Sequence, residues 1–266
     1  MMKMESLKII KIGGNVIDKP ETLDKFLDNF CCVAGPKILV HGGGAVATEL
    51  AKKLGIEVKM VEGRRVTDSS MLKLVTMVYA GLINKQLVAS LQKRGCDAIG
   101  LSGADGNAVP AYKRKDDKID WGFVGDVESS DINARLIDTF IGSNMVPVFC
   151  AITHDCGGSL LNTNADTMAR EIAAAMSSIY NVELIYCFDK QGVLSNPNDD
   201  ESVIPLITKE SFSKMKESGQ VSGGMIPKLD NAFKALENGV RRVVIKHADN
   251  LLEGKKTDII LKNFDE

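Results

Sequence analysis

Short apolar segments alternate with segments of helical periodicity along this chain, and this alternation restricts its fold more than any other feature. Apolar runs at residues 7–12, 37–40 and 145–150 stand among stretches such as residues 21–32, where apolar residues recur every three or four positions. Such alternation is typical of a mostly parallel sheet covered by helices. We therefore predict an α/β fold, arranged as a three-layer αβα sandwich with a mostly parallel central sheet.

The remaining elements follow from the same periodicities. Further strands are predicted at residues 56–61, 96–101, 183–188, 242–245 and 258–261. Further helices are predicted at residues 44–54, 68–94, 131–143, 164–176, 209–217 and 227–238, and a β-hairpin arm with a charged tip at residues 108–127. No internal repeat or linker interrupts the 266 residues, so we expect a single two-lobed domain over residues 1–266.

Charge and composition argue against several classes of function. The formal net charge is −2 and aromatic residues make up 5% of the chain, which argues against a nucleic-acid partner. Lysines interrupt the first apolar residues, and no segment approaches the ~20 apolar residues of a membrane helix, so neither a signal peptide nor a membrane span is predicted. The six cysteines lack zinc-ligand spacing. We expect a cytoplasmic protein with reduced thiols and no membrane partner.

Two predicted strands end in glycine loops, Gly13-Gly14 and Gly42-Gly43-Gly44. Without Cβ atoms, successive backbone N–H groups can face an anion, and the positive end of a following helix adds to their attraction. Because ligands of open α/β sheets bind beyond the carboxyl ends of the strands, both loops are candidate phosphate sites. The Walker A pattern is absent from the sequence, which excludes a P-loop enzyme.

The second loop also admits a different interpretation. Residues 42–47 fit the pattern G-x-G-x-x-A after a strand, and Glu62 lies twenty residues beyond Gly42. An acidic residue near that distance binds the ribose in dinucleotide-binding folds. An NAD-binding oxidoreductase is therefore an alternative.

Charged and amide side chains accompany the glycine loops. Lys11 precedes Gly13 by two residues, and Lys228 lies at a predicted helix start, where a cation is disfavoured unless an anion joins it. Residues 162–166 hold two asparagines and an aspartate, more than one helix cap requires. Arg65 follows a predicted turn, and a planar guanidinium is the usual binder of a carboxylate. These residues are candidates for an anion-binding site.

Seven motifs, taken in order, resemble the amino-acid kinase family, and the resemblance covers nearly the whole chain. The motifs are IKIGG at residues 10–14, VHGGG at 40–44, GRRVT at 63–67, GLSG at 100–103, NTNADT at 162–167, DKQGVL at 189–194 and GGMIPK at 223–228. The arginine and asparagine motifs resemble the acetylglutamate branch. The resemblance implies a carbamate kinase-like fold, with residues 1–170 as an N-terminal lobe for the acyl-amino acid and residues 171–266 as a C-terminal lobe for ATP.

The resemblance also implies roles for individual residues. Those that stabilise and organise the transferred phosphoryl group would be Lys11, Lys228 and Asp166. Phosphate would be bound by the backbone of Gly13, Gly14 and Gly43. The acyl-amino acid would be bound by Gly43, Gly44, Arg65 and Asn162. The nucleotide would be bound by Asp189, Lys190, Gln191, Gly192, Val193, Leu194, Ser222 and Gly224.

The implied reaction is ATP-dependent phosphorylation of the side-chain carboxylate of an N-acyl-L-glutamate, N-acetyl-L-glutamate to N-acetyl-L-glutamyl 5-phosphate, in arginine biosynthesis. A glutamate side chain is already ionised at pH 7, so no base is needed, and His41 is interpreted as structural. ATP would bring Mg²⁺ held largely by its own oxygens, without a protein metal cluster. The family implies a homodimer, and the lack of an N-terminal helical extension predicts insensitivity to arginine.

Departures from the family pattern leave alternatives open. Residues 149–158 differ from the usual proline- and glycine-containing stretch, and Ala104 stands where the family often has lysine. Both departures lie where recognition of the acyl group would change, so N-succinyl-L-glutamate is an alternative acceptor. Another amino-acid kinase, such as glutamate 5-kinase, and a non-catalytic nucleotide sensor are further alternatives.

Overall fold

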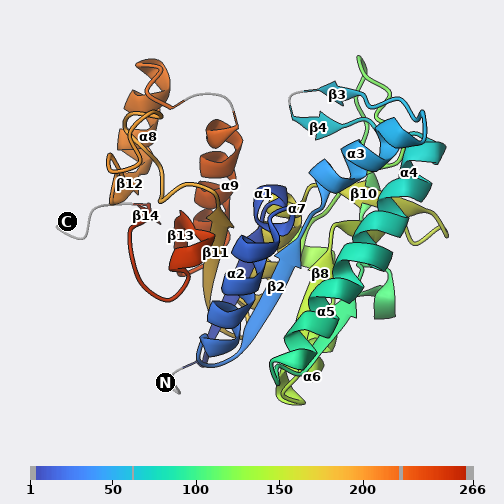
Figure 1. The fold of residues 1–266 in the computed structure, drawn as a ribbon, viewed down its shortest axis with the longest axis horizontal. Coiled ribbons are helices and arrows are strands. Elements are labelled where there is room, and N and C mark those ends of the chain that lie inside the picture. The colour runs from blue at the N-terminus through green and yellow to red at the C-terminus, as the bar shows by residue number, and fades with distance from the viewer. Residues whose placement is uncertain (1–3, 62, 222–223, 262–266) are drawn as a thin grey trace.

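The computed structural model describes residues 4–61, 63–221 and 224–261, and its centre is one large sheet (Figure 1). Eight strands of these residues form it in the order β12, β14, β13, β11, β1, β2, β8 and β5. In chain order they are β1 (Ser6–Ile12), β2 (Lys37–His41), β5 (Ala98–Leu101), β8 (Val146–Cys150), β11 (Asn181–Phe188), β12 (Leu206–Thr208), β13 (Arg242–His247) and β14 (Lys256–Ile260). Strands β13 and β14 pair antiparallel, and the other neighbouring pairs are parallel. The predicted mostly parallel sheet is confirmed.

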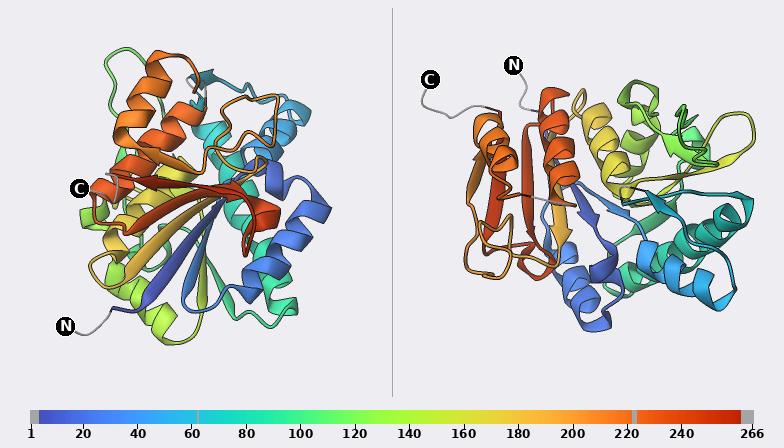
Figure 2. Two further views of the ribbon diagram at one scale, coloured as in Figure 1. Left: turned by 90° about the vertical axis from the view of Figure 1, so that its left-hand side faces the viewer. Right: turned by 90° about the horizontal axis from the view of Figure 1, so that it is seen from above.

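Helices cover both faces of the sheet and complete the predicted three layers (Figure 2). On one side lie α1 (Gly14–Ile17), α2 (Pro20–Cys32), α3 (Gly44–Lys53), α4 (Ser69–Thr76), the π-helix η1 (Met77–Ile83) and α5 (Asn84–Lys93). On the other lie α6 (Ala134–Gly142), α7 (Ala165–Met176), α8 (Lys209–Glu217) and α9 (Met225–Glu237). Short 3₁₀ turns are η2 (Asp105–Asn107), η3 (Ser129–Asp131) and η4 (Ala248–Asn250).

The alternation of side chains along the central strands creates a hydrophobic core on each face. Ile9 of β1 is fully buried among residues of α6 to α9, whereas its neighbour Ile10 is fully buried among residues of α2 to α5. Ile38 and Leu39 of β2 divide in the same way. Successive residues of a strand point to opposite faces, so a strand that is apolar throughout requires helices on both sides.

Smaller sheets lie beside the main one. One consists of β6 (Tyr112–Lys113), β7 (Val124–Asp126), β10 (Leu160–Thr163) and β9 (Ile152–His154), and β3 (Met60–Val61) pairs with β4 (Arg64–Arg65). The antiparallel pair of β6 and β7 confirms the predicted arm. The predicted strand at residues 56–61 was wrong except at its end, because Ile56 and Val58 pack against the core without a sheet partner.

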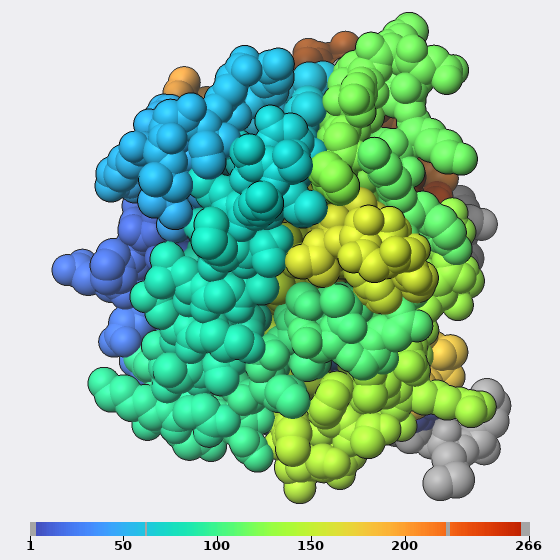
Figure 3. Space-filling view, turned by 90° about the vertical axis from the view of Figure 1, so that its right-hand side faces the viewer, coloured from blue at the N-terminus to red at the C-terminus, as the bar shows by residue number. Residues whose placement is uncertain are grey.

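Residues Ser69 to Lys93 form one continuous helix, as the predicted segment 68–94 allowed. The Asp68 side chain caps it by accepting a hydrogen bond from the Met71 amide at 2.8 Å. By length and composition this helix is sufficient to cross a membrane, so the expectation that no segment approaches that limit was wrong. Its inner face packs in the core, and its outer face flanks the β9–β10 hairpin (Figure 3, teal and yellow). Burial of one face is typical of a core helix.

Candidate active site

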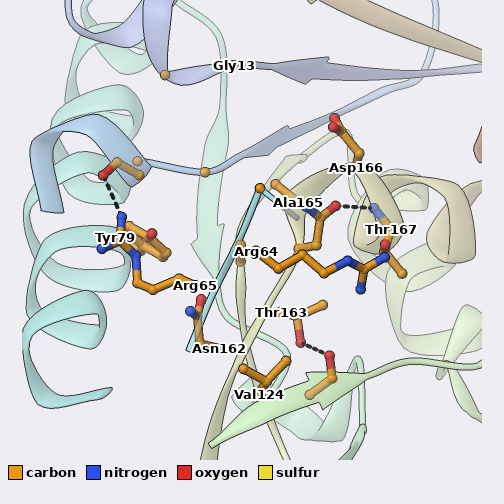
Figure 4. A pocket seen from close by; sticks show the side chains of 18 of the residues that line it. Gly13, Arg64, Arg65, Tyr79, Val124, Asn162, Thr163, Ala165, Asp166 and Thr167 are labelled. Carbon is orange, nitrogen blue, oxygen red and sulfur yellow. Dashed lines mark hydrogen bonds between the residues drawn. The ribbon is translucent and has the colours of Figure 1, made fainter. Parts of the chain in front are cut away.

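A cavity of ≈ 200 Å³ lies beyond the carboxyl ends of β1 and β2 (Figure 4). Both glycine loops line it, together with the β3–β4 hairpin, the end of β7, strand β10 and the first turn of α7. Its charged lining residues are Lys11, Arg64, Arg65, Asp126 and Asp166. The parallel sheet thus brings both glycine loops, Lys11, Arg65 and residues 162–166 to one cavity, whereas Lys228 is not among its lining residues.

Lys11 and Asp166 form an ion pair inside this cavity. The Lys11 Nζ lies 2.6 Å from the Asp166 Oδ1, and both side chains are less than one-fifth exposed. Burial alone would raise the pKa of Asp166, but the positive charges of Lys11 and Lys228 outweigh it and hold that pKa below its ordinary value of 3.8. Asp166 is therefore an ionised carboxylate at neutral pH.

Lys228 approaches the same carboxylate from α9. Its Nζ lies 4.9 Å from the centre of the Phe188 ring, at the end of β11. Burial lowers the pKa of Lys228, and the charge of Asp166 opposes that shift while Lys11 adds to it. The charges of two lysines thus act on one carboxylate.

Gly43 is required by the geometry of the second loop. It has φ +155° and immediately precedes α3, and a Cβ atom at this position would lie 2.4 Å from the Cδ1 of Ile83. A side chain there would collide with the π-helix η1, which carries Ile83 and Tyr79. No side chain caps α3 in the described residues, so its first N–H groups are available to an anion.

Arg65 is buried with neutral hydrogen-bond partners. Its guanidinium donates to the Gly44 carbonyl at 2.9 Å and to the Thr48 Oγ1 at 2.7 Å. Within residues 4–61, 63–221 and 224–261 no carboxylate forms an ion pair with it. A guanidinium has five N–H donors, so Arg65 retains donors for a carboxylate ligand. Tyr79 lies beside it, and burial raises the pKa of that phenol while Arg65 opposes the shift.

Asn162 is linked to Arg65 through Thr67. The Asn162 Nδ2 donates to the Thr67 Oγ1 at 3.0 Å, and that hydroxyl donates to the Arg65 carbonyl at 3.0 Å. Asn164 is the cap of α7, accepting from the Thr167 amide at 3.0 Å. The cap therefore uses Asn164, which leaves Asn162 and Asp166 to face the cavity.

His41 is the last residue of β2 and is fully buried. A carbonyl can only accept, so the 2.8 Å contact with the Gly42 oxygen makes Nδ1 the donor, and Nε2 accepts from Asn84 at 3.1 Å. Burial lowers the pKa of His41 to about 4. This neutral ring fixes the glycine loop and does not face the cavity as a base.

Four of the predicted nucleotide residues line a second pocket of ≈ 230 Å³. Lys190, Gly192, Val193 and Leu194 line it with Pro197, Gln220, Val221 and Met225. Asp189 instead accepts from Asn15 at 2.9 Å, Gln191 accepts from Asn250, and Gly224 is exposed just before α9. Ser222, and Glu62 of the dinucleotide interpretation, lie outside the described residues.

Several lining residues were not predicted. Arg64 adjoins Arg65 in the same motif, and its charge was the available signal. The sequence carried no signal for Tyr79, Val124 and Gly125. These residues line the cavity because of the positions of η1 and of β7 in the small sheet.

Comparison with known proteins assigns this chain to a family. A sequence model described as the amino acid kinase family matches residues 6–247. The chain belongs to the amino-acid kinase family. This assignment confirms the predicted resemblance and displaces the dinucleotide interpretation of residues 42–47.

Members of the amino-acid kinase family resemble this chain over nearly its whole length. Acetylglutamate kinase of Phocaeicola vulgatus is 52% identical, and that of Bacteroides thetaiotaomicron 50%; each alignment covers 96% of this chain and 98% of the relative. The solved structure of Giardia lamblia carbamate kinase bound to AMP-PNP superposes with a TM-score of 0.71 at 13% identity, covering 97% of this chain and 99% of that one. The latter likeness shows the carbamate kinase-like fold.

Proposed function

We propose that this chain transfers the γ-phosphoryl group of ATP to the side-chain carboxylate of an N-acyl-L-glutamate, as a step in arginine biosynthesis. The observation that carries the proposal is the Lys11–Asp166 ion pair set between two glycine loops, in one cavity with the buried Arg65. The names of the two relatives support N-acetyl-L-glutamate as an acceptor.

The reaction requires one anion to attack another. A carboxylate oxygen of the acceptor forms a bond to the γ-phosphorus, the bond from phosphorus to the bridging oxygen breaks, and ADP leaves with that electron pair. No proton is removed from the acceptor, since a glutamate side chain with a pKa of about 4.3 is ionised at neutral pH. The neutral, internally bonded His41 is consistent with a site that needs no base.

Lys11, Lys228 and the loop amides would supply the charge stabilisation. Phosphoryl transfer depends mainly on positioning and on neutralising the transferred group. Asp166 would keep both ammonium groups directed at the same point, since it acts on both. Arg65 and Asn162 would bind the α-carboxylate and fix the distance between that group and the reacting carboxylate.

The positions of the two pockets support the proposal that each lobe binds a different substrate. The cavity is lined by residues between Lys11 and Thr167, whereas the second pocket is lined by residues between Lys190 and Met225. We assign residues 1–170 to the acyl-amino acid and residues 171–266 to ATP. Residues 189–194, Ser222 and Gly224 keep the nucleotide-binding role inferred from the family resemblance.

Mg²⁺, a homodimer and a cytoplasmic location complete the proposal. In the part of the chain that the structure describes, no three His, Cys, Asp or Glu side chains converge on a metal position, so the ion would be held by ATP oxygens and no step above depends on it. Light scattering of the purified protein tests the dimer, and cell fractionation tests the location.

The decisive assay couples ADP release to trapping of the acyl phosphate by hydroxylamine. N-acetyl-L-glutamate, N-succinyl-L-glutamate and free L-glutamate are compared under the same conditions. Hydroxamate formation from an N-acylated substrate supports the proposal. Phosphorylation of free glutamate alone would identify a glutamate 5-kinase, and ATP binding without turnover would identify a sensor.

A further inference from the structure

Helices α7 and α9 carry two of the groups assigned to phosphoryl transfer, and a hydrogen bond joins the two helices one turn further along. Asp166 lies in the first turn of α7, and Lys228 lies in the first turn of α9. Arg170 follows Asp166 by four residues, and Asn231 follows Lys228 by three. Residues at these spacings share one face of a helix, so Arg170 and Asn231 extend the faces on which Asp166 and Lys228 lie.

The hydrogen bond between Arg170 and Asn231 lies in the interior. The Arg170 Nη1 donates to the Asn231 Oδ1 at 2.6 Å, and Asn231 is buried. A guanidinium can only donate, so the amide oxygen is the acceptor. Breaking this bond would leave a buried polar group without a partner, which is costly. The bond therefore fixes the separation of the two helices at this level.

Arg170 is held in its direction by its neighbour Glu171. The Arg170 Nε donates to the Glu171 Oε1 at 2.9 Å, and Nη2 donates to the same oxygen. Glu171 is buried, so its carboxylate requires this cation. Because a guanidinium is planar, the bonds of Nε and Nη2 fix the direction of Nη1, the group that reaches Asn231. Helix α7 thus presents a rigid donor to α9.

Strand β11 contacts the catalytic ends of both helices. The hydroxyl of the fully buried Tyr186 donates to the Asp166 carbonyl at 3.2 Å. Phe188, two residues further along the strand, has the Lys228 Nζ 4.9 Å from its ring centre. Residues two apart point to the same face of a strand, so Asp166 and Lys228 lie over one face of β11. The strand contacts each helix separately, whereas the buried hydrogen bond joins the helices directly.

We propose that Arg170 and Asn231 are positioning residues, which act on the reaction by holding Lys228 in its place beside Asp166. The inference rests on the proposed kinase function. In the described parts of the chain, neither residue is among those that line the cavity or the second pocket, so their effect would pass through Lys228. A displacement of ~1 Å in a group that stabilises the transferred charge can lower the rate by about 10²-fold.

The test compares two substitutions of Asn231 by steady-state ADP release. Asn231→Leu approximately keeps the volume and removes the acceptor, so we expect kcat to fall by about tenfold or more, with a smaller change in either KM. Asn231→Asp keeps an oxygen for Arg170 and should retain most of the wild-type kcat. Asn238→Leu, at the exposed end of α9, is the matched control and should resemble the wild type.

A second comparison distinguishes positioning from a general loss of structure. In a chain that already carries Lys228→Ala, Asn231→Leu should lower kcat little further, because the side chain that it positions is gone. Arg170→Lys keeps the charge that Glu171 requires but loses the planar donor, so it should lower kcat in the same way even where Asn231→Leu does not fold. Urea unfolding identifies the variants that are folded.

The outcomes separate the inference from the proposed function. Turnover by the wild type with an unchanged kcat in folded Asn231→Leu or Arg170→Lys overturns the positioning role and leaves the kinase proposal intact. An equal loss of kcat with and without the Lys228 side chain also overturns it, since the effect would then not pass through Lys228. No turnover by the wild type overturns both.

Discussion

Acidification should destabilise this protein through the buried His41. The ring is fully buried, and its pKa falls from 6.5 to about 4 on folding because burial disfavours the imidazolium. As the pH falls below 6.5, the unfolded chain therefore binds a proton that the folded chain does not. The part of the free energy of unfolding that depends on His41 is fully present above that pH and is lost as the pH falls toward about 4.

The magnitude follows from the width of this window. A shift of about 2.5 pKa units corresponds to about 3 kcal/mol in full, and roughly half of it should be lost between pH 6.5 and about pH 5. Asp166 does not contribute there, since the pKa of that carboxyl is held below 3.8 and its stabilisation is lost only at lower pH. His41 thus dominates the expected slope at mildly acidic pH.

Urea unfolding at stepped pH measures the slope directly. His41→Gln replaces the ring with a group that does not titrate, so its stability, although lower throughout, should vary less between pH 6.5 and about pH 5. The control is His154→Gln, which removes an imidazole from the β9–β10 hairpin. An equally steep slope in His41→Gln, or an equal flattening in the control, would refute the argument from burial.

Further predictions concern the cavity. Lys11→Ala and Lys228→Ala should each lower kcat by ~10²-fold or more, and ADP release measures this; a change below about threefold would remove the assigned role. Gly43→Ala should lower stability by about 2 kcal/mol or more because of its collision and positive φ, whereas Gly142→Ala, which has open space, should not. Arg65→Lys should raise the KM for the acyl-amino acid by roughly tenfold or more, with a smaller effect on kcat.

The sequence predicts the large elements well because their signals are local. Each central strand is a short apolar run, and α7 begins at a side-chain cap that can be read from neighbouring residues. Short strands such as β9, β10 and β12 were missed because three or four residues carry too little periodicity, and only their partners make them strands. The π-helix η1 continues directly from α4 into α5, without a break in the helix that would mark it in the sequence.

For the candidate site, the sequence indicated individual residues but not the hydrogen bonds between them. The link from Asn162 to Thr67 joins residues 95 positions apart, and nothing in either motif indicates it. The direction of Arg64 depends on the strand parity of β4, a two-residue strand that could not be predicted within a segment expected to turn. Long-range geometry of this kind is set by the packing of the whole sheet and is absent from any single segment.

The balance of charge around Asp166 explains why the site has one carboxylate between two lysines. Without that carboxylate, burial would favour loss of a proton from Lys228, whose pKa is already lowered, and Lys11 would repel it. With a second carboxylate the ammonium charges would be cancelled and nothing would remain to attract phosphate. One ionised carboxylate pairs with Lys11 and opposes the loss of a proton from Lys228, and two lysines beside one carboxylate leave positive charge in excess. In the proposed reaction, this positive charge would allow an anionic acceptor and an anionic nucleotide to approach each other.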